Sequence, residues 1–310
     1  MKKIHSLREA VAYYLQCRRR LGFSLRQEGA LLASLVDYAQ QTHHRGALTT
    51  SLALAWAQLP PQASPLWWAS RLGMIRRFAR FWAAYDSRTE VPPRGVFGPT
   101  SRRGPVHIYT QKEIRVLLGA TQQLGGESGC RSRLYRTLLG LLACTGLRIS
   151  EALALGDQDV DWPSGVLTVR RAKGGQSRCL PLQASAVSAL RAYRQWRQGA
   201  IVQPKSSAFF LTSKGRPPSY GQVAKVFRKL CSDSGWIHDP RPRLHDLRHT
   251  FAVNCLIRWH QKNREVGQKI LALSTYLGHR QVSDTYWYLT AVPQLLNLSS
   301  KRFEKGDSRL

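Results

Sequence analysis

The chain has 310 residues, 43% of them hydrophobic, with 9 Trp, 11 Tyr and 9 Phe, so it is long enough for two domains with packed cores. Its 47 Lys and Arg against 18 Asp and Glu give a formal charge of +29, spread over both halves, which indicates a polyanionic partner, most simply nucleic acid. No apolar run approaches the roughly 20 residues of a membrane span, and the N-terminus lacks the apolar core of a signal peptide, so we expect a cytoplasmic protein without a membrane partner.

Helical periodicity dominates residues 1–86, which we expect to form a helical domain. Apolar residues recur at helical spacing over 7–39, with a break after which Ser24 is placed to cap a second helix. Shorter helical stretches cover 51–59 and 66–85.

The last of these stretches carries four arginines beside an aromatic stripe that includes Trp67, Phe78 and Trp82. The arginines are Arg71, Arg76, Arg77 and Arg80. One interpretation is a packed core with solvated arginines, and the other lays the basic side along DNA. The two are compatible, because one face of a helix can pack in a core while the other contacts phosphates.

Residues 87–107 are rich in Pro, Gly, Ser and Arg, a composition typical of an interdomain linker. Arg102 and Arg103 within it suggest a strap across a polyanion. A second domain is expected over 108–310. A capping-box pattern that starts at Thr110 predicts the start of its first helix.

The second domain is expected to be mixed. An apolar helix over 134–143 precedes two strands at 166–169 and 178–182, whose Gly-rich connection is a hairpin signal, and the pattern after Ala184 is helical again. The predicted fold is therefore mainly α, with a helical N-terminal domain and an α+β domain that holds a small antiparallel sheet.

Two basic residues of this domain stand in distinctive local contexts. Arg148 lies at a helix start, where a cation is electrostatically disfavoured, and Glu151 is placed to orient it through an ion pair. A guanidinium fork can hold two phosphate oxygens at once. Lys173 lies at the hairpin tip, where a lysine is usually only solvated, but the neighbouring glycines allow a close approach and its ammonium can donate a proton.

A basic run with Arg241 and Arg243 precedes a helical segment in which His245, Arg248 and His249 share one face. The two histidines also have the spacing of helix-borne metal ligands. No Glu follows His245 as in zinc proteases, however, and no cysteine cluster lies nearby, so we expect neither a metal nor a cofactor.

His279, in Tyr-Leu-Gly-His, and Tyr288, in Ser-Asp-Thr-Tyr-Trp-Tyr, complete the set. A histidine at a turn is usually structural, and the aromatic segment is typical of core packing, which we expect for Trp287. Taken together, two arginines, a lysine, two histidines and a phenol suit one task, the holding of a phosphodiester while an oxygen nucleophile attacks it.

These motifs, in this order, resemble those of the tyrosine recombinase (phage integrase) family over most of residues 108–295. The helical first domain resembles that family's core-binding (SAM-like) domain. In the family the nucleophile lies nine positions after the histidine of Leu-Gly-His, which singles out Tyr288 over Tyr286 and Tyr276. The aromatic segment is also similar to recombinases carried by bacterial mobile elements.

The resemblance implies a site-specific DNA recombinase that uses neither metal nor ATP. Tyr288 would attack a phosphodiester and become joined to the 3′-phosphate, releasing a 5′-hydroxyl. Arg148 and Arg248 would clamp the non-bridging oxygens, and Lys173 would protonate the leaving oxygen.

The two histidines receive supporting roles from the same resemblance. His245 would assist the deprotonation of Tyr288, and His279 would hydrogen-bond the phosphate. Because the reference pKa of tyrosine is near 10, four nearby cations are expected to lower the cost of forming the phenolate.

The implied partners are double-stranded DNA, three further copies of the chain in a tetramer on two sites, and accessory recombination proteins. The implied location is the bacterial cytoplasm, on the nucleoid. The tail after Tyr288 contains Val292, Leu295, Leu296 and Leu298. It would form a helix that docks either on its own domain or on a neighbouring copy.

Three other classes use overlapping features. Type IB topoisomerases carry nearly the same residues and act as monomers, so a relaxation assay against a two-site recombination assay separates them. A DNA-binding architectural factor with a decayed site is disfavoured by the intact set, and a metal-dependent nuclease would be recognised by its sensitivity to EDTA.

Overall fold

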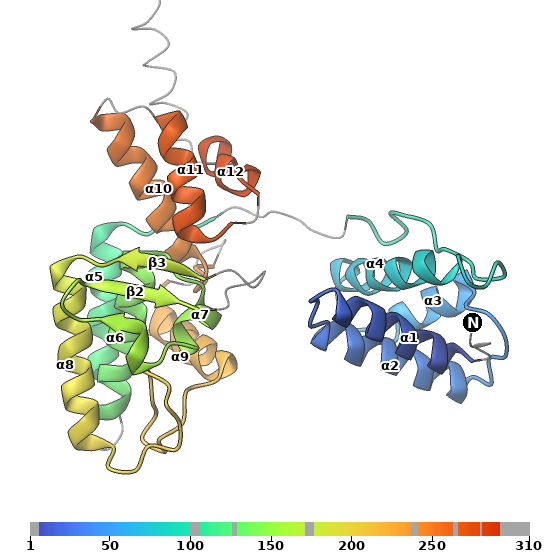
Figure 1. Ribbon diagram of the computed structural model, residues 1–310, viewed down its shortest axis with the longest axis horizontal. Helices are drawn as coiled ribbons and strands as arrows, with labels where there is room; N and C mark the ends of the chain where they lie inside the picture. Colours follow the sequence, from blue (N-terminus) through green and yellow to red (C-terminus); the bar gives the residue numbers. More distant parts are fainter. Residues whose placement is uncertain are drawn as a thin grey trace, which may run out of the picture. The chain divides into compact units, whose positions relative to one another are not determined.

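The computed structural model describes residues 6–99, 106–125, 129–170, 177–236, 241–262, 266–279 and 281–291. The chain divides into two compact units, 1–103 and 104–310, which are taken separately below (Figure 1). In the part of the chain that is described, no helix combines the length and the apolar character needed to cross a membrane.

The described part of the first unit, residues 6–99, contains four helices. They are α1 (Leu7–Arg20), α2 (Arg26–Gln41), α3 (Thr50–Ala57) and α4 (Pro65–Trp82). The hydroxyls of Ser6, Thr49 and Ser64 cap α1, α3 and α4. No side chain caps α2, which begins after Leu25 in a left-handed conformation, so the predicted Ser24 cap is wrong.

The core of the first unit forms where the apolar faces of these helices meet, with Trp56 and Phe78 fully buried at its centre. Part of the segment expected as a linker lies against this core. The backbone N–H of Glu90 donates to the Leu48 carbonyl at 2.9 Å. The Phe97 ring packs edge-on against Trp68, with centroids 5.8 Å apart. Residues up to 99 thus pack on the first unit.

The second unit is also mainly helical. Its α-helices are α5 (Gln111–Ala120), α6 (Cys130–Thr145), α7 (Ile149–Leu153), α8 (Ala184–Ala200), α9 (Tyr220–Asp233), α10 (Asp246–Gln261), α11 (Val266–Leu277) and α12 (Ser283–Ala291). Within the described residues, the short 3-10 helix η1 (Thr121–Gln123) follows α5, and the 3-10 helix η3 (Asp157–Asp159) lies between α7 and the sheet. The predicted capping box of α5 is confirmed, since Thr110 and Glu113 bond each other's backbone N–H.

A three-stranded antiparallel sheet interrupts the helices, in the order β1 (Val160–Asp161), β2 (Val166–Val169) and β3 (Arg178–Pro181). The pairing of β2 with β3 places Val169 opposite Arg178, and the chain between these two residues includes the predicted hairpin tip. The predicted fold class, mainly α with a small antiparallel sheet, is confirmed.

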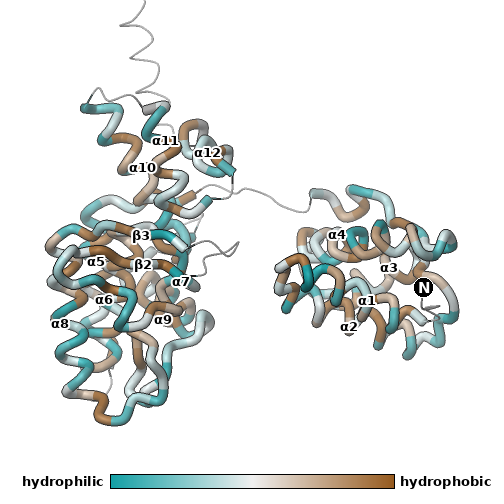
Figure 2. The backbone as a smooth tube through the Cα atoms, in the orientation of Figure 1, coloured by the Kyte–Doolittle hydropathy of each residue, from teal (hydrophilic) through white to brown (hydrophobic). Residues whose placement is uncertain are grey.

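Two clusters of buried side chains hold the second unit together. The larger one joins α6 to the sheet, α8 and α9. The smaller one joins α10, α11 and α12 and includes Tyr288. Figure 2 shows hydrophobic and hydrophilic segments alternating along these helices, as burial of one face of each helix requires. Helix α12, which carries Tyr288, is therefore held against α10 and α11 by apolar contacts.

Candidate active site

The C-terminal end of α11 gathers three arginines from distant parts of the chain. The last carbonyls of a helix have no partner within the helix and carry partial negative charge. Arg178 of β3 donates to the Tyr276 carbonyl at 2.7 Å. Arg248 of α10 donates to the Leu277 carbonyl at 2.7 Å, and Arg148 donates to that same carbonyl at 3.5 Å and to the next one, that of Gly278, at 3.0 Å. One helix end thus holds two candidate phosphate-binding guanidiniums side by side.

Glu151 fixes the first of these arginines. Its carboxylate accepts the Arg148 guanidinium at 2.9 Å and the Arg148 backbone N–H at 3.0 Å. The same carboxylate accepts two bonds from Arg178, at 3.1 and 2.8 Å. Burial alone would raise the pKa of Glu151, but these guanidiniums outweigh it and lower the pKa below its ordinary value. Glu151 therefore stays ionised and couples α7 to the sheet.

Arg248 is the most enclosed cation of the cluster, with 2% of its surface exposed. Besides the Leu277 carbonyl it bonds the Gly146 carbonyl at 2.8 Å, at the end of α6. Gly146 has φ +63°, and an added Cβ there would lie 2.7 Å from Phe251, so this turn requires glycine. Burial and the charge of Arg148 lower the pKa of Arg248 to about 10, which still leaves it charged at neutral pH.

Tyr288 of α12 lies beside this pair and is 2% exposed. Its phenol oxygen is 3.1 Å from Nδ1 of His249. Burial raises the pKa of Tyr288, while the charges of Arg248 and Arg148 and a hydrogen bond with Arg248 oppose the rise. The expected lowering of the cost of phenolate formation is thus present but outweighed by burial. The phenol is protonated at neutral pH.

His279 follows the turn at Gly278 and lies near the same tyrosine. Its Nδ1 contacts the buried Thr285 hydroxyl at 2.7 Å, and its ring is stacked with that of Tyr288 at 6.3 Å between centroids. Burial and the charges of Arg248 and Arg148 lower the pKa of His279 to about 4. The imidazole is therefore neutral at pH 7.

His245 lies at the N-cap of α10, with its ring 4.7 Å from that of His249 and perpendicular to it. Partial burial and the charge of Arg248 lower the pKa of His245 to about 4, although its side chain still reaches solvent. Both candidate histidines are neutral at pH 7, which leaves the two arginines as the cations among the described candidates.

Three predicted site residues lie outside the described residues, namely Lys173, Arg102 and Arg103. The loop before α10 is described. Arg241 is exposed, and Arg243 bonds the buried Asp246 carboxylate at 2.9 Å while remaining half-exposed.

Arg71 is not at a DNA-accessible surface. Its guanidinium is buried, donates to the Trp56 carbonyl at 2.8 Å and stacks 3.6 Å from the centroid of the Trp56 ring. It supports the core of the first unit, so we do not retain it among the DNA-contacting candidates.

The other three arginines of α4 remain candidates. Arg77 and Arg80 are exposed, and Arg76 is partly buried. Arg76, Arg77 and Arg94 line a cavity of about 620 Å³. Burial and the charges of Arg80 and Arg94 lower the pKa of Arg76, as expected where like charges gather.

Sequence reasoning missed two residues of the site. The sequence puts His249 on the same helix face as His245 and Arg248 and indicates no role for it in the reaction, although it contacts the Tyr288 oxygen. Arg178 was treated only as part of a strand. A charged residue within an otherwise apolar strand is the sequence feature that could have indicated a role for Arg178. Its side chain is only 10% exposed.

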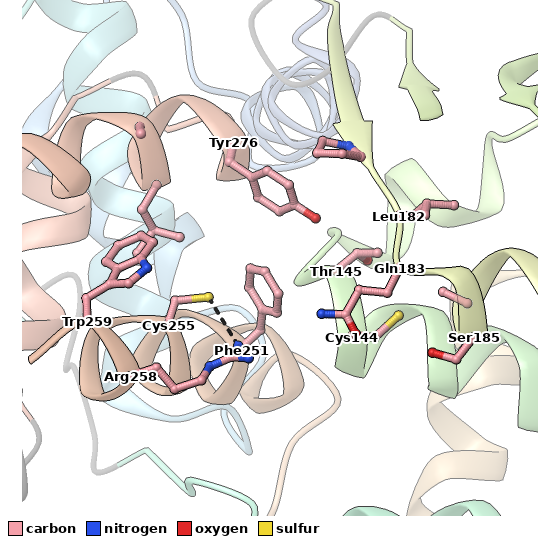
Figure 3. A pocket seen from close by; sticks show the side chains of 14 residues that line it. Cys144, Thr145, Leu182, Gln183, Ser185, Phe251, Cys255, Arg258, Trp259 and Tyr276 are labelled. Atoms are coloured by element: carbon pink, nitrogen blue, oxygen red, sulfur yellow. Dashed lines mark hydrogen bonds between the residues drawn. The ribbon is translucent and has the colours of Figure 1, made fainter. Parts of the chain in front are cut away.

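A separate apolar pocket of about 320 Å³ opens between α6, β3, α10 and α11. Phe251, Trp259 and Tyr276 line it together with Cys144 and Cys255 (Figure 3). Within the described ranges, no group of three or more His, Cys, Asp or Glu is placed to hold a metal ion.

Paired guanidiniums beside a tyrosine have the chemical character that nucleophilic attack at a phosphodiester needs. Comparison with known proteins assigns the chain to a family. A model described as the phage integrase family matches residues 108–294. The chain belongs to this family of tyrosine recombinases, enzymes that cleave and rejoin DNA in site-specific recombination.

Individual relatives support the same assignment. The chain is similar to the integrase/recombinase y4rB of Sinorhizobium fredii, with 39% identity over 97% of this chain and 98% of the relative. It is also similar to the tyrosine recombinase XerC of Chlamydia caviae, with 28% identity over 70% of this chain and 65% of the relative.

Solved structures share the fold. The integrase of transposon Tn1549 in complex with transposon right end DNA has a TM-score of 0.69 at 18% identity, covering 97% of this chain and 99% of that one. A lambda integrase dimer bound to a core site has a TM-score of 0.62 at 15% identity, covering 91% and 77%.

Proposed function

We propose that the protein recombines specific DNA sites through a covalent 3′-phosphotyrosyl intermediate formed by Tyr288, without metal or ATP. Attack by the phenol oxygen releases a 5′-hydroxyl and conserves the phosphoester bond energy, so resealing needs no other energy source. Arg148 and Arg248 neutralise the charge that gathers on the phosphorus, and Lys173 protonates the leaving 5′-oxygen.

One observation carries the proposal: the two guanidiniums of Arg148 and Arg248 meet on the Leu277 carbonyl, next to the Tyr288 phenol. A phosphodiester placed against both forks brings its phosphorus toward the phenol. His279 is held by Thr285 beside the same tyrosine, in a position to bond a phosphate oxygen. His245 completes the set on the solvent side of α10.

The partner in this proposal is a DNA duplex contacted by both units. Residues 1–86 form the core-binding domain, 87–107 the Arg-rich connection and 108–310 the catalytic domain. Contacts to phosphate come from Arg76, Arg77 and Arg80 in the first, from Arg102 and Arg103 in the second, and from Arg241 and Arg243 in the third. The formal net charge of the chain, +29, favours a polyanionic partner such as DNA.

Recombination of two sites requires four protomers, so we propose a tetramer on DNA, with accessory proteins where the sites demand them. The tail 292–310 is apolar at several positions. We propose that it binds in the apolar pocket of Figure 3 on a neighbouring protomer. We further propose a role in the movement of a bacterial mobile element, on chromosomal DNA in the cytoplasm. The transposon integrase among the similar structures supports that role.

Covalent trapping tests the chemistry. Nicked suicide duplexes are selected by wild-type protein from a pool with a randomised 30-base-pair segment, in the presence of EDTA. The expected result is a denaturation-resistant adduct that Tyr288→Phe abolishes and Tyr286→Phe retains. Tyr286 is the matched control, because it lies on the same helix and is 49% exposed. An adduct that persists in Tyr288→Phe would refute the nucleophile.

Deletion of residues 292–310 tests the proposed assembly. Native gels with DNA should show loss of the tetramer while single-site binding persists. Undiminished tetramer formation would rule out exchange of the tail.

A further inference from the structure

His249 contacts the phenol oxygen of Tyr288. Its Nδ1 lies 3.1 Å from the phenol oxygen, and the two rings meet edge to face at 5.5 Å between centroids. His249 is on α10 one turn after His245, and its ring also packs at 5.5 Å from that of Trp287. The contact therefore belongs to the packed interface of α10 and α12.

The direction of this hydrogen bond follows from the surroundings. The phenol oxygen already faces the Arg248 guanidinium, which can only donate. His249 is neutral at pH 7, because burial and the charges near it lower its pKa to about 3. A neutral imidazole has one nitrogen that accepts. The phenol O–H thus donates to Nδ1, and the ring proton lies on Nε2.

We propose that His249 is a catalytic residue of the recombination reaction: it orients the Tyr288 phenol and accepts its proton during attack. The inference rests on the proposed nucleophilic role of Tyr288. As the bond from the phenol oxygen to phosphorus forms, the phenolic proton passes to Nδ1 of His249. The bond from phosphorus to the 5′-oxygen breaks, and that oxygen takes a proton from the general acid or from water.

The same residue serves the rejoining step in reverse. When the 5′-hydroxyl attacks the phosphotyrosine, its proton returns to the group that supplied it in cleavage, the general acid or water. The tyrosine oxygen leaves and takes its proton back from Nδ1 of His249. A bound phosphodiester brings negative charge next to the imidazole and raises its proton affinity, since an opposite charge favours the protonated form. His249 thus becomes a better base when its substrate is present.

This assignment changes the expected role of His245. The His245 ring lies against that of His249, and it is His249 whose Nδ1 accepts the hydrogen bond from the phenol. His245 therefore acts behind His249. Charged and titratable groups surround the contact between His249 and Tyr288. They are His245, Arg248 and Arg243 from α10 and the loop before it, Arg148 from the start of α7, His279 after α11, and Asp284 and Tyr288 from α12.

Variants at position 249 separate the two parts of the role. Asn places an oxygen acceptor near the site of Nδ1 but cannot take a proton, and Phe keeps the ring without an acceptor. The control is His43→Asn in the first unit, because that histidine is exposed and its φ of +53° suits Asn. Adduct formation is followed on the selected suicide duplexes, and DNA affinity is measured separately by gel shift.

We expect His249→Asn to slow cleavage on the order of 10²-fold or more, within the range of general-base contributions, and His249→Phe to slow it further, both with unchanged DNA affinity. The rate of His249→Asn should rise about tenfold per pH unit as hydroxide replaces the lost base, and imidazole should restore part of the activity of His249→Ala. A substrate with sulfur in place of the 5′-bridging oxygen should not rescue these variants, because its better leaving group bypasses only the general acid.

A second measurement needs no DNA. In protein labelled with ¹⁵N-histidine, Tyr288→Phe should move the Nδ1 resonance of His249, which His249→Asn identifies by its loss. An unmoved resonance overturns the inference. Wild-type cleavage rates in His249→Asn and His249→Phe, with the adduct still lost in Tyr288→Phe, overturn it while the proposed function stands. Absence of any wild-type adduct overturns both.

Discussion

At the scale of single residues, the surroundings of a side chain decide between a binding role and a structural one. Arg71 and Arg77 are six positions apart on α4, and the sequence treats them alike. Arg77 is exposed, whereas Arg71 is buried against Trp56 and bonded to its carbonyl. Burial of a charge is costly unless hydrogen bonds satisfy it, so the position of Arg71 is part of the packing of the first unit.

Replacement of Arg71 should therefore affect stability rather than DNA binding. We expect Arg71→Ala to lower the free energy of unfolding by about 2 kcal/mol or more, from the lost charged hydrogen bond and the lost packing. Arg77→Ala is the matched control and should stay within about 0.5 kcal/mol. Urea denaturation measures both. Unchanged stability of Arg71→Ala together with weaker DNA binding would contradict the structural role.

The neutral histidines make stability depend on pH. The folded pKa values of His249, His245 and His279, about 3, 4 and 4, lie below the ordinary 6.5 of the unfolded chain. Below pH 6.5 these histidines therefore bind protons in the unfolded state but stay unprotonated in the folded state. The stabilisation is complete above that pH and is lost as pH falls.

Thermal denaturation between pH 7.5 and 5 should show a falling midpoint over this window, where ordinary carboxylates remain ionised. His249→Asn should make the midpoint less dependent on pH, because it removes one group whose pKa is lower in the folded state than in the unfolded state. A midpoint independent of pH over the same interval would show that these histidines titrate normally in the folded protein.

At the scale of secondary structure elements, the site is organised by the end of α11. Carbonyls of Tyr276, Leu277 and Gly278 accept guanidiniums from β3, α10 and the start of α7. Glu151 closes this arrangement from the opposite side, with two bonds to Arg178 and two to Arg148. Strand β3 is thereby tied through Arg178 and Glu151 to Arg148.

Glu151→Gln tests this coupling. An amide retains the volume and one acceptor but leaves Arg148 and Arg178 without their countercharge. Breaking one partner of a buried ion pair costs about 3 to 5 kcal/mol. We expect a loss of stability of that order and slower cleavage by protein that remains folded. Asp233→Asn, in the exposed pair with Lys229, is the control and should change little. Unchanged stability in Glu151→Gln would refute the coupling.

At the scale of the whole molecule, charge governs the encounter with DNA. With 47 Lys and Arg spread over both units, binding should be steeply dependent on salt. A protein that contacts about six to ten phosphates loses roughly 10³- to 10⁵-fold in affinity between 50 and 200 mM salt.

Affinity for a random duplex, measured across this salt range, should fall within those limits. Arg76→Ala should weaken binding for all sequences and reduce the slope of log affinity against log salt by about 1. Arg8→Ala is the control, because Arg8 is already paired with Asp37. Affinity that hardly changes with salt would contradict a phosphate-based mode of binding.

The sequence alone determined the class of fold, the family and the order of the motifs. Helix periodicity, the Thr110 capping box and the hairpin are local signals, because they depend on residues a few positions apart. The tertiary structure decided which arginines meet, since Arg148 and Arg248 are a hundred residues apart and join only at the end of α11. It also decided that burial lowers the pKa values of the histidines, that Arg71 is buried and that His249 contacts the Tyr288 phenol. Burial and contact depend on which faces of distant elements pack together, and no local pattern specifies them.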